Sequence, residues 1–327
     1  MRAAWHTEFG PATEVLQVGE LDTPEPGEGD VLVRVVASGI NPLDVKKRVG
    51  ARGAFDAERA VPHYDGAGVI EAVGPGVDAA CIGERVWLFE GQFGRWLGTA
   101  AEYICLPSSR ANPLPESVSF SEGACLGIPA LTAHRAVCAD GSVAGQTVLV
   151  TGAAGAVGSY AVQFAALSGA TVIGTVSSDE KAAQAVASGA THTINYKTED
   201  VAARVKELTD GAGVDRMVEV ELGGNIPVTS RVLKANAVIA AYASMAVPEV
   251  PLPFYPMLMA GPTIEIVAVF TVPEPDKMQG VRDIGEWMAA GKLRHNVGAT
   301  FSLGDIAAAH EAVESGSVIG GAVLEIS

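Results

Sequence analysis

The pattern of apolar and polar positions divides the chain into three stretches. Before residue 123, short β-type runs at 31–37, 67–73 and 85–89 are separated by turn sequences such as Pro24-Glu-Pro-Gly. From about residue 124 to 264, strand-like and helical stretches alternate. After residue 265 come a strand, two helices near 277–290 and 305–315, and a last strand at 318–326. The first stretch predicts a compact, mostly antiparallel β domain.

The middle stretch has the pattern of a doubly wound α/β unit. Such alternation is typical of a parallel sheet with helices on both faces. We therefore predict an α/β chain of two domains, a β-rich one from residues 1–123 and 265–327 and a doubly wound one from residues 124–264. The predicted strands of the second domain are 147–151, 171–176, 193–195, 214–220 and 237–242, and its helices lie near 157–168, 179–188, 198–209 and 226–234.

A glycine-rich turn after the first strand of this domain is suited to a phosphate group. Gly152, Gly155 and Gly158 follow the apolar run that begins at Thr147, and a helical stretch comes next. Such a unit directs backbone N–H groups and a helix N-terminus toward one point, which is typical of pyrophosphate binding. Ala153 stands where the common G-x-G-x-x-G fingerprint has its first glycine. The strand and helix on either side therefore carry the prediction of a dinucleotide-binding domain.

The end of the second predicted strand favours NADP(H) over NAD(H). A NAD-binding unit has an acidic residue about 20 positions on, which accepts hydrogen bonds from the ribose 2′-OH. Here the strand ends near Ser177 (177 − 155 = 22), and Lys181 lies just behind it. Hydroxyl and ammonium donors suit a 2′-phosphate, and Tyr196 after the third strand is a further candidate donor. An ordinary helix start, with a serine cap and acidic residues favoured by the helix dipole, is the alternative.

Composition and charge narrow the classes of function. The 327 residues carry a formal net charge of −16, which disfavours nucleic acid and anionic membranes as partners. There is no uninterrupted run of about 20 apolar residues and no signal-peptide pattern, so we expect a soluble, cytoplasmic protein. The four cysteines form no C-x-x-C motif and are expected to be reduced, mostly buried thiols. The six histidines show no ligand spacing, and each is expected at the surface or partly buried.

Several segments in both predicted domains match one pattern in the same order along nearly the whole chain. They are residues 39–44, 63–74, 83–86, 101–103, 127–136, the glycine turn, 194–196 and 319–321. Together they resemble the medium-chain dehydrogenase/reductase superfamily, and within it the zinc-free quinone oxidoreductases that include zeta-crystallin. The resemblance implies a GroES-like, β-rich catalytic domain together with a Rossmann-type doubly wound domain that binds NADPH.

The resemblance also implies chemistry without a metal. Zinc-dependent members have a cysteine at the position of Asn41 and a His-Glu pair at the positions of Tyr64 and Asp65, and amide and phenol groups are poor zinc ligands. Without a Lewis acid, the substrate has to accept hydride unaided, as quinones and other conjugated carbonyl compounds do. We expect Asn41 and Tyr64 to be catalytic, with Asn41 positioning the nicotinamide or the substrate oxygen. No residue is singled out as an essential acid or base.

The implied site residues come from both domains. Lys46, where the family often has tyrosine, and Trp96 are expected in the substrate pocket. Glu221 departs from the family pattern, which has a smaller or apolar residue there. The cofactor contacts implied are Asn41 and Asp44 over the nicotinamide, Ala154, Gly155, Ala156 and Val157 at the pyrophosphate, Ser177, Lys181 and Tyr196 around the 2′-phosphate, Tyr242, Ala243 and Ser244 by the nicotinamide ribose, and Val269, Phe270 and Thr271 on a strand at the nicotinamide end.

Three functions are consistent with these residues. The first is an NADPH-dependent quinone oxidoreductase. The second is an NADPH-dependent enoyl or α,β-unsaturated ketone reductase, and the third is an NADPH-binding protein of low turnover. In this superfamily the dinucleotide domains commonly pair edge to edge, here near residues 242–246 and 264–270, so the resemblance implies a homodimer or homotetramer.

Overall fold

The computed structural model describes residues 1–51 and 53–326, which fall into two compact units. Unit 1 comprises Met1–Ile128 and Val281–Ser327, and unit 2 comprises Pro129–Gly280. The second border lies 16 residues beyond the predicted residue 264 (280 − 264 = 16), and the strand β13 (Thr263–Ile266), which crosses the predicted border, pairs in parallel with the sheet of unit 2.

Unit 1 is built on a mostly antiparallel sheet in the order β14-β15-β3-β4-β5-β7, and β6 pairs with β3. Along β3 (Asp30–Ile40), Val31, Val33 and Val35 are buried and alternate with half-buried residues, as expected for a strand with one face on the core. The other elements are β1 (Arg2–Trp5), α1 (Ala12–Val15), β2 (Gln17–Glu20), α2 (Pro42–Arg48), β4 (Asp65–Val73), β5 (Arg85–Leu88), β6 (Tyr103–Pro107), β7 (Ala111–Pro113) and α3 (Phe120–Gly123).

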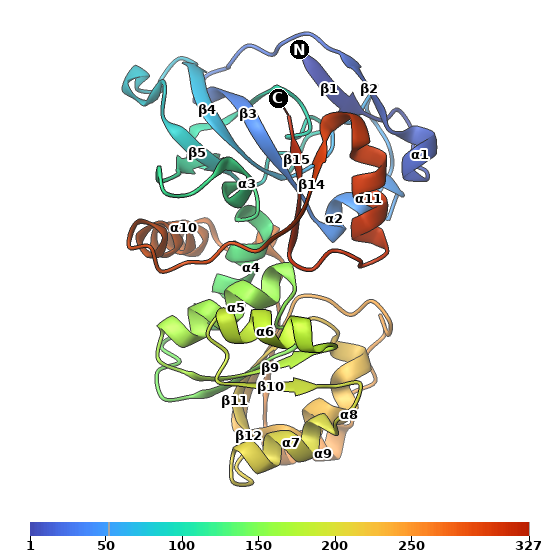
Figure 1. Cartoon of the computed structure of the whole chain (residues 1–327), viewed down its shortest axis with the longest axis vertical. Coiled ribbons are helices and arrows are strands. Elements are labelled where there is room, and N and C mark those ends of the chain that lie inside the picture. The colour runs from blue at the N-terminus through green and yellow to red at the C-terminus, as the bar shows by residue number, and fades with distance from the viewer. Residues whose placement is uncertain (52, 327) are drawn as a thin grey trace. The chain divides into compact units, whose positions relative to one another are not determined.

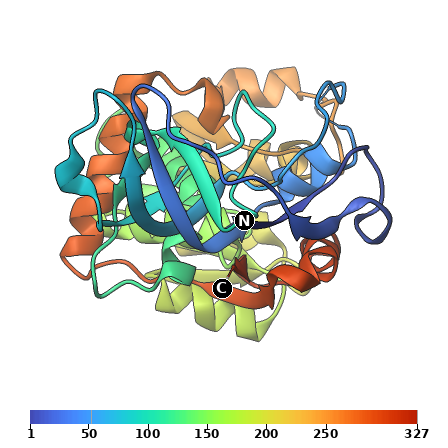
Figure 2. The same ribbon diagram turned by 90° about the horizontal axis from the view of Figure 1, so that it is seen from above.

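The C-terminal segment completes unit 1. Its last strand β15 (Gly321–Glu325) pairs antiparallel with β3, and β14 (Val297–Ser302) pairs in parallel with β15. The helix α11 (Ile306–Glu314) lies beside α1 of the N-terminal segment in both views of the chain (Figures 1 and 2). The last strand is shorter than the predicted 318–326, because Gly320 has a φ of 103° and turns the chain before the strand begins.

Unit 2 confirms the predicted Rossmann-type parallel sheet. Its strand order β10-β9-β8-β11-β12-β13 corresponds to 3-2-1-4-5-6 in chain order, and every pair is parallel. Helices α5 and α6 lie on one side of the sheet and α7 and α9 on the other (Figure 1). The bounds are α4 (Gly127–Cys138), β8 (Thr147–Val150), α5 (Ala156–Leu167), β9 (Thr171–Val176), α6 (Asp179–Ala187), β10 (His192–Asn195), α7 (Val201–Leu208), β11 (Val214–Glu219), α8 (Leu222–Val232), β12 (Leu233–Ala241), α9 (Phe254–Ala260) and α10 (Glu274–Ala289).

Two expectations about sulfur and imidazole groups were wrong. All four cysteines are free, but only Cys125 is buried, and the other three are partly exposed. Among the histidines, His63 and His310 are fully buried in unit 1. Within residues 1–51 and 53–326, no helix combines the length and the apolar character needed to cross a membrane.

Candidate functional site

The glycine turn of unit 2 has the backbone geometry of a phosphate-binding loop. Gly152, two residues after the end of β8, has a φ of 63°, and Gly155 is the N-cap of α5 with its N–H donating to Gly152 O at 2.9 Å. A Cβ at position 158 would overlap Gly152 O, so only glycine allows this close approach of helix and turn. Ala153 is buried, and its Cβ would lie 2.7 Å from a Cβ at Gly174. The space for the Ala153 side chain is therefore provided by Gly174 on the neighbouring strand β9.

The carboxyl end of β9 brings two of the predicted phosphate contacts together. Lys181 Nζ donates to Ser177 Oγ at 3.1 Å, and Ser178 caps α6 by accepting the Lys181 backbone N–H at 3.3 Å. The predicted cap and the predicted donor pair therefore coexist, on adjacent serines. Tyr196, directly after β10, is about half exposed. A phosphate at this corner would meet an ammonium and hydroxyl groups, which are suitable donors for it.

The loop after β12 is shaped by Glu221. Its carboxylate caps α8 and accepts N–H groups from Met245 at 2.7 Å and Ala246 at 3.0 Å. Ser244, a predicted ribose contact, accepts the Gly223 N–H at 2.9 Å and donates to Val247 O at 2.6 Å. Glu221, which departed from the family pattern, thus folds the loop that carries residues 242–244.

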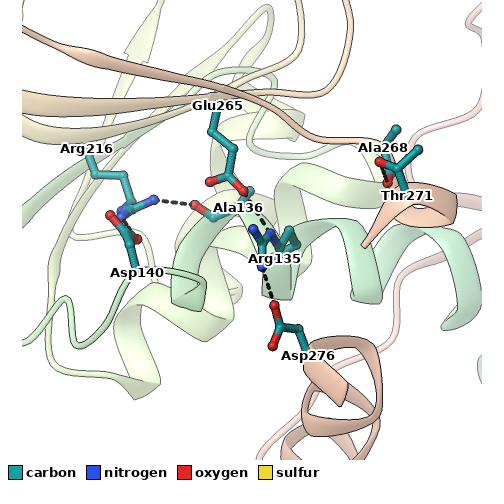
Figure 3. Close-up of polar contacts among 8 residues, drawn as sticks. All are labelled: Arg135, Ala136, Asp140, Arg216, Glu265, Ala268, Thr271 and Asp276. Carbon is teal, nitrogen blue, oxygen red and sulfur yellow. Dashed lines mark hydrogen bonds and ion pairs between the residues drawn. The ribbon is translucent and has the colours of Figure 1, made fainter. Parts of the chain in front are cut away.

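Residues 269–271 do not form the strand that was predicted for them. β13 ends at Ile266, and Val269, Phe270 and Thr271 form a single 3-10 turn. Thr271 Oγ1 donates to Ala268 O at 3.0 Å, as Figure 3 shows. The hydroxyl closes its own turn in place of the ladder hydrogen bonds a strand would need, which is the local competition that threonine offers.

Two arginines connect strands of unit 2 to α4 and its C-terminal end, and one of them also reaches α10 (Figure 3). Arg135 of α4 binds Glu265 of β13 at 2.8 Å and Asp276 of α10 at 3.0 Å. Arg216 of β11 is buried, donates to Ala136 O at 2.8 Å and pairs with Asp140. The turn at 269–271 is thereby held between a strand and a helix that are both tied to α4.

In unit 1, a buried polar cluster surrounds the start of α2. Asn41 is the N-cap, its N–H donates to Asp44 Oδ2 at 2.6 Å, and its Nδ2 donates to Asp65 Oδ2 at 2.7 Å. Asp65 Oδ2 also accepts the Ile128 N–H at 2.9 Å. Burial raises the pKa of Asp44 to about 7, and burial together with the nearby Asp44 charge raises the pKa of Asp65. The cluster therefore holds a proton near neutral pH.

This cluster does not suit zinc. Asn41 and Asp65 are hydrogen-bonded to each other, and Tyr64 offers a phenol, so the thiolate and imidazole donors that zinc prefers are missing from these three positions. Across the described parts of the chain, no three His, Cys, Asp or Glu side chains gather in a way that could hold a metal ion.

The two predicted pocket residues have different surroundings. Trp96 Nε1 donates to Asp56 Oδ1 at 2.7 Å. Its ring meets the ammonium of Lys47, whereas the prediction had chosen the neighbouring Lys46. Lys47 also lies over the ring of Tyr64, which is buried. Sequence reasoning missed Lys47, and the family position that drew attention to Lys46 gave no signal for it.

A second missed group is Glu219, at the carboxyl end of β11. Its Oε1 accepts from Thr151 Oγ1 at 2.8 Å, Asn225 Nδ2 at 2.8 Å and the Glu221 N–H at 2.7 Å. Burial raises its pKa. β8 and β11 are neighbours where the strand order reverses, and ligands of doubly wound sheets bind at such a point. A carboxylate at the end of the predicted strand 214–220 was the available signal.

Comparisons with known proteins agree with this geometry. The family model "Alcohol dehydrogenase GroES-like domain" matches residues 27–116, and "Zinc-binding dehydrogenase" matches residues 156–285. A human quinone oxidoreductase is 30% identical over 319 residues, which cover 97% of this chain and 95% of that protein. The chain belongs to the zinc-free quinone oxidoreductases of the medium-chain dehydrogenase/reductase superfamily.

Solved structures place this quinone oxidoreductase-family chain among full-length neighbours. An NAD-dependent alcohol dehydrogenase is 31% identical with a TM-score of 0.89, and each chain is covered completely. A mycobacterial protein solved in complex with NADPH is 28% identical with a TM-score of 0.85, again with complete coverage of both chains. The first neighbour is NAD-dependent and the second was solved with NADPH, so the choice between NAD(H) and NADP(H) depends on the residues of this chain.

Proposed function

We propose that this protein is an NADPH-dependent quinone oxidoreductase that works without zinc. The observation that carries the proposal is the corner at the end of β9, where Lys181 Nζ and Ser177 Oγ lie 3.1 Å apart and no carboxylate occupies the strand end. A ribose 2′-OH needs an acceptor at this position, whereas a 2′-phosphate needs donors and positive charge.

The glycine turn and the β9 corner belong to the same unit and fit the two ends of an adenosine diphosphate phosphorylated at its 2′ position. We assign the pyrophosphate to residues 154–157, whose backbone N–H groups lie at the start of α5. We assign the 2′-phosphate to Ser177 and Lys181, with Tyr196 beside them. Bound NADPH would supply the hydride.

The protein's part in the reaction is to orient groups and to hold protons. Asn41 donates one amide N–H to Asp65, which fixes the plane of its side chain, and we assign its amide as the donor to a substrate oxygen. Reduction of a quinone to a hydroquinone takes up one hydride and one further proton. The buried carboxyls of Asp44 and Asp65 hold a proton near neutral pH, beside the donor we assign to the substrate oxygen.

The first test is oxidation of NADPH and, in parallel, NADH, followed by absorbance. The acceptors are 1,4-benzoquinone, 9,10-phenanthrenequinone, an enone, an enoyl thioester and a simple aldehyde. Fast turnover of quinones with NADPH and none of the aldehyde is expected. Preference for the enone or the thioester would replace the proposal with a conjugated-carbonyl reductase, and inactivity with every acceptor would leave a nucleotide-binding protein of low turnover.

The nucleotide preference has its own test. Lys181→Ala should weaken NADPH binding by about 1–3 kcal/mol, because a charge-assisted phosphate contact is lost, and should leave NADH binding nearly unchanged. Lys206→Ala is a matched control, since Lys206 lies on α7 and donates only to a backbone carbonyl, Gly211 O, at 3.0 Å. Equal losses for both nucleotides in fluorescence titrations would contradict the assignment of Lys181.

We further propose a homodimer, formed through the free edge of β13. That edge strand carries Ile266, which is 70% exposed, and the nearby α9 exposes Tyr255 and Met259 at 77% and 84%. Contiguous exposed apolar groups beside an unpaired strand edge are typical of self-association. Ile266→Lys should shift the sedimentation coefficient from dimer to monomer, and a monomeric parent protein would refute the proposal.

The four free cysteines support a reducing, cytoplasmic location.

A further inference from the structure

The loop of residues 90–97, here named the Trp96 loop, runs between β5 and β6 without regular secondary structure. Its own side chains anchor it to the rest of unit 1. Gln92 Nε2 donates to Val61 O at 2.8 Å, and Arg95 donates to Cys105 O on β6. These anchors fix the backbone at two points, and the aromatic ring of Trp96 lies beyond them.

Trp96 itself is held by groups from other segments. Its indole N–H donates to Asp56 Oδ1 at 2.7 Å, and its ring lies 4.9 Å from the ring of Phe55. The same loop exposes Phe93 and Leu97, each by about half. The loop therefore presents a largely apolar, aromatic surface, which suits a flat apolar ligand.

Lys47 connects this loop to the helix that carries Asn41. From the last turn of α2, its Nζ lies 4.8 Å from the ring centroid of Trp96 and 5.2 Å from that of Tyr64. The same ammonium donates to Gln92 O at 3.3 Å and Arg95 O at 3.4 Å. One charge thus attracts two rings and two carbonyl groups at once.

We propose that Lys47 is a positioning residue: its ammonium holds the Trp96 loop against α2 and Tyr64, and so fixes an aromatic wall that selects flat, polycyclic quinones over small ones. The proposal rests on the proposed function for the identity of the substrate, and on the contacts of Lys47 alone for the loop. Without the ammonium, the two carbonyl groups lose their donor and the rings lose their cation, and the loop becomes free to move.

The charge on Lys47 is sensitive to pH near the physiological range. Partial burial lowers its pKa to about 8, opposed by the carboxyl of Asp44 one turn earlier on α2. Arg48 follows it on the helix, and Asp56 faces the cluster through the indole of Trp96. His6, at the end of β1, feels the positive charges of Arg48 and Lys47, which lower its own pKa further after burial. As the pH rises through about 8, the amine loses its proton and the cation–π attraction weakens.

The kinetic test compares Lys47→Met with Lys47→Arg, using 9,10-phenanthrenequinone and 1,4-benzoquinone. Lys47→Met keeps the length of the side chain and removes the charge. We expect it to raise KM for phenanthrenequinone about tenfold, with kcat within about twofold and a smaller change for benzoquinone. Lys47→Arg keeps the cation and should restore most of the selectivity. Lys206→Met serves as the control, because Lys206 also donates to a backbone carbonyl, that of Gly211, but lies on α7 of unit 2.

A second test needs no turnover and separates this inference from the proposed function. The emission of Trp96 is obtained as the difference between the parent protein and Trp96→Phe, and is followed from about pH 6 to about pH 9.5. We expect a transition near pH 8 that is absent in Lys47→Met. A flat difference signal in the parent protein, or equal KM changes for both quinones in Lys47→Met, would overturn the proposal even if the enzyme reduces quinones as proposed.

Discussion

Replacement of His310 by glutamine tests a buried hydrogen-bond chain that sequence reasoning did not foresee. Thr99 Oγ1 donates to Asp65 O at 2.6 Å, so Ser38 Oγ, 2.7 Å away, must donate to Thr99 and accept from His63 Nδ1 at 2.8 Å. Burial lowers the pKa of both imidazoles, so each is neutral; His63, protonated on Nδ1, then has an unprotonated Nε2 that accepts from His310 Nε2 at 2.9 Å. Nδ1 of His310 is a buried nitrogen without a hydrogen-bond partner.

The size of the expected change in the free energy of unfolding follows from the difference between the pKa values of each histidine in the folded and unfolded chain. Burial lowers the pKa of His63 to about 3 from an ordinary value near 6.5, and burial, then the neighbouring His63 imidazole and the charge of Arg48, lower that of His310 in the same direction. The unfolded chain thus binds the proton first as the pH falls. The contribution of the two neutral histidines to the free energy of unfolding is fully present above about pH 6.5. It is lost as the pH falls below this value, by about 2 kcal/mol per histidine at about pH 5.

Glutamine at 310 keeps a donor for His63 Nε2 but does not titrate. Urea unfolding at several pH values should show the variant gaining about 2 kcal/mol on the parent protein between about pH 7 and pH 5. Nitrogen chemical shifts should independently give the Nδ1–H form for His63 and the Nε2–H form for His310. A stability difference that does not change with pH, or the opposite tautomers, would refute the proton assignment.

Three further substitutions test packing in and around the site. Gly158→Ala would place a Cβ against Gly152 O and should weaken NADPH binding at least tenfold in a fluorescence titration, because the turn has to open. Gly285→Ala, in α10, meets nothing within 4 Å and should raise the free energy of unfolding by about 0.5–1 kcal/mol through helix propensity; a loss in urea titrations would contradict this. Arg216→Met removes the donor from Ala136 O and should cost about 1–3 kcal/mol by the same assay, and an unchanged midpoint would show that the buried arginine contributes little.

The sequence predicted the parallel sheet of unit 2 well because its strands are covered on both faces. Val148, Leu149 and Val150 of β8 are all buried, which gives the unbroken apolar run that the pattern shows. The boundaries of the helices and strands were harder to predict. α8 was predicted from residue 226 but begins at Leu222, because Glu221, an unusual N-cap residue, accepts hydrogen bonds from a loop that follows β12.

The parts of the site that sequence could not give depend on contacts between distant segments. His63 and His310 are 247 positions apart, and neither has a local pattern that marks it as buried. Arg216 is buried in β11 and is satisfied by Ala136 of α4 and by Asp140 in the turn after that helix, some 80 positions earlier. Lys46 and Lys47 are adjacent lysines, and only the helical turn they occupy decides which one reaches Tyr64 and Trp96.

The short helix α2 retains two charges that oppose folding, which supports a functional role for it. The pKa of Asp44 is raised to about 7, so the folded chain binds a proton more tightly than the unfolded chain, and stability falls by on the order of 4 kcal/mol as the pH rises from about 4 to 7. The pKa of Lys47 is lowered to about 8, so stability is also lost as the pH falls from about 10.5 to 8. Near pH 7.5 both losses of stability are close to complete.

Apolar residues at these two positions would avoid both losses of stability. Ionisable groups that are kept in such surroundings cluster at functional sites, because catalysis and recognition require them. The donor Asn41 at one end of α2 and the loop-holding Lys47 at the other give that requirement a physical form: a single helix of seven residues sets both the hydrogen bond we assign to the substrate oxygen and the wall we assign to its ring.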